Sequence, residues 1–132
     1  PLGLPNRSIG GAGWFYDAVS GSGQAGQKEY RPVYTEGSWI NTLMDVPDLN
    51  NIGLLISTTG QVTYVGDVFF YLDDGSKLDD GSGHTGVKVA LEGQAMPALD
   101  SYVKVTGISS CYKRDGSLFR LVRATGIAEV GR

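Results

Sequence analysis

Cysteine and histidine are almost missing from this chain. Its 132 residues include one of each, Cys111 and His84. A single cysteine excludes an internal disulfide, and we expect Cys111 to be a small apolar residue near a strand end. A Ser–His–acid triad or a Cys–His pair would have to use His84, which is distant from Cys111 in the sequence. Catalysis is therefore not expected.

Motifs that hold zinc or nucleotides are missing too. The chain has no zinc-type His/Cys spacing, no Walker-type phosphate loop and no GxGxxG after a strand. It has no secretory signal and no apolar run near the roughly 18 residues that a membrane-spanning helix needs. What remains is 41% hydrophobic and 19% charged residues, with 20 glycines. This composition indicates one globular domain with many turns.

Charge is unevenly divided along the chain. Residues 1–85 contain four basic and ten acidic side chains, whereas residues 86–132 contain seven basic and four acidic ones. The net charge of −3 thus combines an acidic first part with a basic second part. Such a split permits head-to-tail attraction between copies, or a local basic face for an anionic ligand.

The clearest structural signal lies between residues 51 and 74. Apolar residues alternate with polar ones in its first half, which indicates a half-buried strand. The apolar positions of one parity are Leu54, Ile56, Val62 and Tyr64. Gly60 predicts a bend or a bulge in this strand. A short turn then leads into an aromatic strand.

Three further strands complete the pattern. Asp115-Gly116 predicts a hairpin turn before the last strand, which Gly126 interrupts. Helical periodicity is not sustained over ten residues anywhere, so the sequence predicts an all-β protein. The expected strands cover about 52–65, 67–73, 86–91, 101–110 and 117–130, with a short helical turn near 95–99.

Residues 1–51 are rich in glycine and proline and follow no period. We expect an extended N-terminal arm with short strands, followed by a barrel at 52–132. Pro32 argues against a central place for its strand in any sheet. Apolar clusters in such an arm dock on their own barrel or on a neighbour. The side chains expected to make these assembly contacts are Trp14, Phe15, Tyr16, Trp39 and Ile40.

The strand order, with a bent first and last strand, resembles the OB-fold over about residues 52–130. The stretches that resemble OB-fold domains of secreted and surface-associated bacterial multidomain proteins are NIGLLISTTGQVTYV, FFYLDDGS, GVKV, YVKVTGISSCYK and LFRLVRATGIAEV. The resemblance implies a five-stranded Greek-key barrel and an extracellular or cell-surface location. In similar proteins a segment like PLGLPNRSIGG joins the domain to a preceding one. Since the chain starts at Pro1 without methionine, we expect a longer, tandem or multidomain parent protein.

OB-folds bind single strands and oligosaccharides across their second and third strands. Phe69 and Tyr71 share one face of the second strand, and Lys88 lies on the third. Stacking rings beside a cation are what single-stranded nucleic acid needs. The alternative is that the rings pack in the core, and the acidic loop beside them would repel phosphates. If nucleic acid binds, affinity should fall with salt and with Lys88→Ala.

The sequence LDDGS occurs twice in succession, at 72–76 and 78–82. Its four carboxylates are candidate calcium ligands: Asp73, Asp74, Asp79 and Asp80. Their spacing departs from the D-x-[DN]-x-[DN]-G calcium loop with its later glutamate. The alternative is a solvated acidic loop without a cofactor.

We therefore expect a non-catalytic OB-fold module that serves structural assembly, with a second copy or a tandem neighbour as partner. An arm that adds a strand to the next subunit would satisfy both the arm and an open sheet edge. Such a head-to-tail contact propagates into a filament unless it closes. The alternative is a binding module for single-stranded nucleic acid or oligosaccharide. Membrane insertion is not expected.

Overall fold

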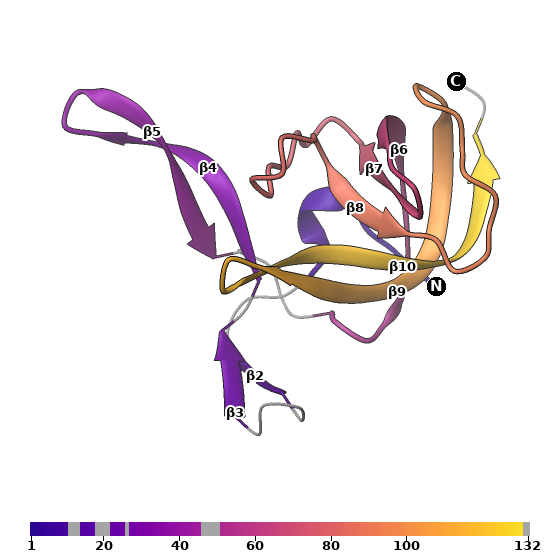
Figure 1. Ribbon diagram of the computed structural model, residues 1–132, viewed down its shortest axis with the longest axis horizontal. Coiled ribbons are helices and arrows are strands. Elements are labelled where there is room, and N and C mark those ends of the chain that lie inside the picture. The colour runs from indigo at the N-terminus through magenta and orange to yellow at the C-terminus, as the bar shows by residue number, and fades with distance from the viewer. Residues whose placement is uncertain (11–13, 18–21, 26, 46–50, 131–132) are drawn as a thin grey trace.

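The computed structural model describes residues 1–10, 14–17, 22–25, 27–45 and 51–130. Five strands close into a barrel in the order β6-β7-β8-β10-β9, with β9 returning to β6 (Figure 1). The barrel strands are β6 (Leu55–Val65), β7 (Phe69–Asp73), β8 (Val87–Ala90), β9 (Tyr102–Arg114) and β10 (Ser117–Glu129). Neighbours are antiparallel except β8 and β10, which are parallel. This confirms the predicted all-β, OB-fold-like barrel.

The predicted helical turn near 95–99 was wrong. Residues 94–98 contain no helix, and a turn at 99–100 leads into β9. Pro97 disfavours helical backbone for the residue before it. The Gln94 side chain instead fixes this segment, because it donates to the Ala124 carbonyl at 3.0 Å and accepts from the Glu92 N–H at 2.7 Å. In the described part of the chain, no helix is long and apolar enough to cross a membrane.

The long strands bend where glycine or a bulge permits it. β6 pairs with β9 up to Gln61 and with β7 from Gln61 onward, with a register shift between Val62 and Tyr64. In β10 the register with β9 shifts between Ala124 and Gly126. These bends let each strand serve two neighbours, which is how a short barrel closes.

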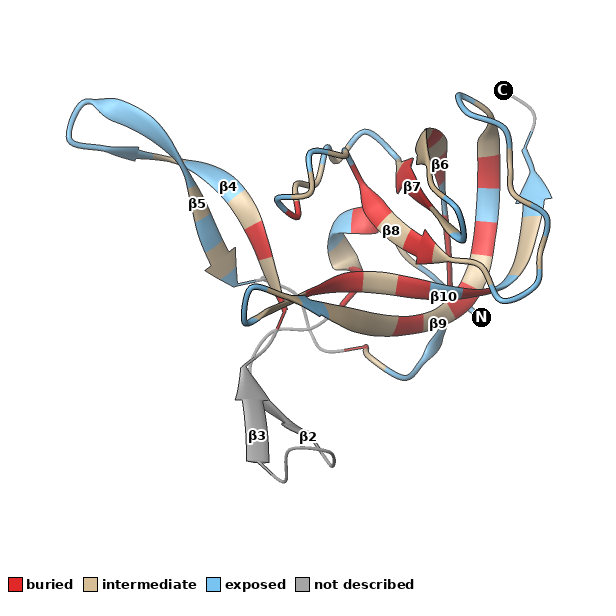
Figure 2. Ribbon diagram, in the orientation of Figure 1, coloured by how far each residue is buried: buried red, intermediate tan, exposed pale blue. Residues whose placement is uncertain are grey.

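The core fills the barrel from alternate positions of its strands, seen as red bands in Figure 2. Its buried members are Ile9, Ile56, Val62, Phe70, Leu72, Val87, Val89, Val103, Val105, Val122 and Ala124. Ile9 is the member that comes from outside the barrel strands. The core is therefore completed by the N-terminal region.

The first ten residues pack against the barrel instead of extending from it. β1 (Leu2–Gly3) pairs in parallel with β6 at Ile56 and Ser57. A 3₁₀ turn, η1 (Asn6–Ser8), then brings Asn6 and Ile9 to fully buried positions. This part of the predicted arm thus lies on its own barrel.

Two hairpins follow in the N-terminal region. β2 (Trp14–Asp17) pairs with β3 (Ser22–Ala25), and β4 (Lys28–Thr35) pairs with β5 (Ser38–Asp45). The predicted contacts at Trp14, Phe15 and Tyr16 lie on β2, and these side chains are outside the described part of the structure. The β4–β5 hairpin projects away from the barrel (Figure 1).

Candidate functional site

The three predicted ligand residues lie together on the outer face of the barrel. Tyr71 pairs with Lys88 across β7 and β8, on the side opposite the buried Phe70. The Lys88 ammonium lies 4.5 Å from the ring centre of Phe69 and 4.5 Å from that of Tyr112. Both distances suit cation–π attraction. Phe69, Tyr71 and Lys88, the residues predicted to share a ligand face, therefore lie next to one another.

Besides Tyr112, two more rings join this group, and none of the three was predicted. Tyr64 lies 6.0 Å from Phe69, and the His84 ring stacks on Tyr64 with centroids 3.5 Å apart. Alternation alone places Tyr64 with the core residue Val62. The bulge between them turns Tyr64 to the outer face, where it pairs with Tyr71. We call Tyr64, Phe69, Tyr71, His84 and Tyr112 the aromatic layer.

The aromatic layer is partly covered by the chain's own loop. Asp80 accepts hydrogen bonds from the hydroxyls of Tyr71, at 2.6 Å, and of Tyr112. Burial, followed by the bond to Asp80, raises the pKa of Tyr71 to about 12, and the same causes raise the pKa of Tyr112. Tyr71 itself is only 2% exposed. A ligand on this face would meet mainly Tyr64, Phe69 and Lys88.

The two LDDGS copies form the same turn twice. In each copy the first aspartate accepts from the glycine N–H two residues on, as Asp73 does from Gly75 at 3.2 Å and Asp79 from Gly81 at 2.7 Å. The second aspartate accepts from the serine N–H, at 2.9 Å in both copies. These are Asx turns, which explains the Asp-Asp-Gly-Ser composition. Within the described ranges, no three His, Cys, Asp or Glu side chains are grouped to hold a metal.

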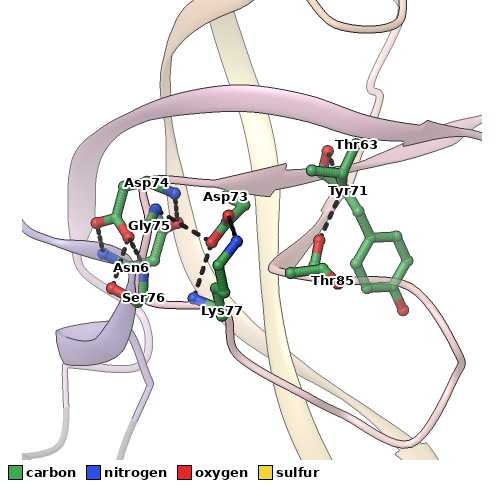
Figure 3. Close-up of polar contacts among 9 residues, drawn as sticks. All are labelled: Asn6, Thr63, Tyr71, Asp73, Asp74, Gly75, Ser76, Lys77 and Thr85. Atoms are coloured by element: carbon green, nitrogen blue, oxygen red, sulfur yellow. Dashed lines mark hydrogen bonds and ion pairs between the residues drawn. The ribbon is translucent and has the colours of Figure 1, made fainter.

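The second aspartate of each copy also fastens a distant segment. Asp74 accepts the Asn6 N–H at 2.8 Å, and the Asn6 side-chain oxygen accepts the Asp74 N–H at 2.7 Å (Figure 3). Burial alone would raise the pKa of Asp74, but hydrogen bonds from Ser76 and Asn6 outweigh it and lower that pKa. Burial likewise opposes ionisation of Asp80, and bonds from Ser82, Tyr112 and Tyr71 lower its pKa. Asp74 and Asp80 are therefore ionised aspartates that each hold a distant segment by hydrogen bonds, and we call them the two clamps.

Large apolar side chains are exposed on the β4–β5 hairpin. The exposed fractions are 60% for Tyr34, 70% for Trp39, 51% for Ile40 and 38% for Leu43. Tyr34 and Trp39 form an edge-to-face pair with ring centroids 5.4 Å apart. Figure 2 shows the outer part of the hairpin as largely exposed. The predicted contact residues Trp39 and Ile40 are thus available to a partner.

The base of this hairpin is held firmly on the barrel. Glu29 and Arg120 form a buried ion pair at 2.7 Å. The Tyr30 N–H donates to the Asp79 carbonyl at 2.8 Å, and the Tyr30 ring stacks on Phe119. These contacts fix Glu29 and Tyr30, at the start of β4, to the barrel.

Along β5, the edge of the hairpin is not paired with another strand in the described part of the chain. The Tyr30 N–H donates to Asp79 and therefore points away from β5. Backbone groups of residues two apart in a strand point the same way, so the nitrogen of Pro32 also faces away from β5. Proline has no N–H to donate there. The residues opposite Tyr30 and Pro32 are Leu43 and Asn41, whose backbone groups point away from β4. β5 contains no lysine or proline. Its one charged residue, Asp45, lies at its end, so the rest of β5 lacks the charged side chains and prolines that usually protect an edge strand.

Comparison with protein-family models, curated proteins and solved structures finds no match for this chain. The resemblance to secreted and surface-associated bacterial proteins stays a prediction.

Proposed function

We propose that this protein is a non-catalytic, OB-fold-like module of a secreted or surface protein that joins subunits through the β4–β5 hairpin. The observation that carries the proposal is the group of exposed side chains on this hairpin, Tyr34, Trp39, Ile40 and Leu43. Burying one large apolar side chain fully contributes about 1.5–3 kcal/mol. A partner that covers Trp39 and Ile40 would therefore gain substantial binding energy.

The open edge of β5 offers the means of attachment. An isolated two-stranded hairpin is marginally stable in water, and a third strand strengthens it. A strand of a second copy or of a neighbouring domain, added beside β5, would satisfy the backbone groups of Asn41 and Leu43. If the added strand is not itself β5, the contact is head-to-tail and extends into an array.

The test is the size of the protein in solution as its concentration rises. We expect wild type to associate in sedimentation or light-scattering measurements, and Trp39→Ser combined with Ile40→Ser to weaken association at least about tenfold. Leu99→Ser is the control, because Leu99 is 55% exposed but lies far along the chain, between β8 and β9. A protein that stays monomeric up to millimolar concentration would contradict self-assembly.

The aromatic layer supports a second candidate, binding of single-stranded nucleic acid or oligosaccharide. Half-buried rings of Tyr64 and Phe69 beside Lys88 occupy the face that OB-folds use. For a labelled thymidine oligonucleotide, we expect affinity to fall steeply with salt and with Lys88→Ala, but not with Lys104→Ala. A salt-independent affinity for a neutral oligosaccharide would favour sugar binding instead. Absence of binding to both probes would exclude this candidate.

A further inference from the structure

We propose that a cavity between η1, the base of β4 and the link joining the two LDDGS copies binds the phosphate or sulfate group of a small organic ester. The cavity has a volume of about 450 Å³. Three cations line it, one from each element: Arg7, Arg31 and Lys77. Tyr30, Pro32 and Leu78 form its less polar wall. The site is distinct from both the hairpin tip and the aromatic layer.

The distribution of charge singles out this cavity. Residues 1–85 contain only four basic side chains against ten acidic ones. Three of those four line the cavity, and the fourth, Lys28, forms an ion pair with Asp45. An acidic region that gathers its few cations around one hollow attracts an anion there.

The carboxylate in the cavity wall is already neutralised. One oxygen of Glu29 accepts from Arg120 at 2.7 Å, and the other lies 3.2 Å from Nε of Arg31. Arg120 is buried and has no place in the lining. The Glu29–Arg120 pair thus cancels its own charge, which leaves the charges of Arg7 and Arg31 in excess, while Asp73 partly offsets the charge of Lys77.

Hydrogen bonds hold the backbone at two of the three cations, Lys77 and Arg7. Figure 3 shows Lys77 beside the first LDDGS turn, where the Lys77 N–H donates to Asp73 at 2.9 Å. This bond holds Lys77 in the left-handed region, at φ 52°. Its side chain is 79% exposed, and its ion pair with Asp73 is long, at 4.0 Å. On η1, the Arg7 carbonyl accepts from Arg120 at 2.8 Å. The backbone is therefore ordered while the charged ends of Arg7 and Lys77 reach solvent.

The lining also defines the class of ligand. Guanidinium groups present paired donors that match the oxygens of phosphate and sulfate, and an ammonium adds a point charge. A volume of about 450 Å³ exceeds the need of an inorganic anion and falls in the range of small-molecule sites. The ring of Tyr30 and the Pro32 and Leu78 side chains would contact the organic part. The expected ligand is thus a monoester with a ring-sized substituent.

The test is titration of the protein with four probes: inorganic phosphate, phenyl phosphate, phenyl sulfate and phenol. We expect saturable binding of phenyl phosphate or phenyl sulfate, with amide chemical-shift changes centred on residues 7, 31 and 76–78. The preferred ester identifies the anionic group. Inorganic phosphate should bind more weakly, and phenol should not produce these shifts.

Two substitutions and a control complete the experiment. Arg7→Gln and Lys77→Gln should each weaken ester binding roughly tenfold, the loss expected for one charged hydrogen bond. Lys104→Gln, which removes an exposed cation elsewhere, should leave affinity unchanged. Unchanged melting temperatures establish that the variants fold. Equal affinity in wild type and both cavity variants, or shifts outside the cavity, would overturn the proposal.

Discussion

Gly60 and Gly126 both interrupt long strands, but their surroundings differ. A Cβ atom at Gly60 would lie 2.6 Å from the backbone carbonyl of Asp73, whereas one at Gly126 would meet nothing within 4 Å. The absence of a side chain at Gly60 lets β7 approach β6 closely. At Gly126 no neighbouring atom is close enough to require a glycine. A bend in the strand and a close approach of neighbouring backbone are therefore separate reasons for a glycine in a strand.

This difference leads to a direct prediction. Gly60→Ala should lower the free energy of unfolding by about 1–3 kcal/mol, because backbone must move to accept the methyl group. Gly126→Ala should change it by no more than about 0.5 kcal/mol. Urea denaturation of the two variants measures both values. Equal losses at the two positions would show that the contact with Asp73 is not the cause.

Tyr64 shows how far the sequence predicts individual residues. Alternation correctly buries Ile56 and Val62, which come before the bulge. Beyond the bulge the same parity turns Tyr64 outward. A bulge inserts one residue and reverses every later assignment in that strand, and the sequence at residues 62–64 contains no glycine that would reveal it.

At the scale of elements, the repeated LDDGS turns connect segments that are far apart in the sequence. Asp74 holds Asn6, and Asp80 holds Tyr71 and Tyr112. The repeat itself predicts turns and carboxylates. The partners of the aspartates cannot be predicted from the repeat. Tyr112 follows Asp80 by 32 residues and reaches Asp80 only when β9 is part of the barrel.

These clamps make stability depend on acid pH. Asp74 and Asp80 have pKa values below the ordinary 3.8 in the folded protein. Since an unfolded aspartate titrates near 3.9, their contribution is present above about pH 4 and is lost as pH falls through the folded values. We expect the free energy of unfolding, measured with urea, to decrease steadily from about pH 4 downward.

Asp80→Asn tests which carboxylate is responsible. The variant should lose about 1–3 kcal/mol at pH 7, because the hydroxyls of Tyr71 and Tyr112 lose an ionised acceptor. Its acid-dependent loss should also be shallower than that of wild type. Asp67→Asn, at an exposed position before β7, should retain wild-type stability at pH 7. An unchanged acid slope in Asp80→Asn would exclude this clamp as a source of the dependence.

At the scale of the whole molecule, the predicted five strands are present and the N-terminal region is divided. The barrel follows from strand periodicity and turn residues, which are local signals. Residues 2–10 belong to the barrel through the parallel pairing of Leu2 with Ile56, a contact that no local pattern predicts. Residues 31–45 instead form the projecting hairpin, whose apolar content the sequence does show.

The buried guanidinium of Arg120 has a consequence for how the chain acquires its structure. It donates to the carbonyls of Ile9, at 2.6 Å, and Arg7, across 111 and 113 residues. Contacts of such sequence separation form late and make folding slow. During synthesis from the N-terminus, Ile9 must therefore wait until β10 has left the ribosome before its core position exists. We therefore expect the segment that is made first to be the last to reach its place in the fold.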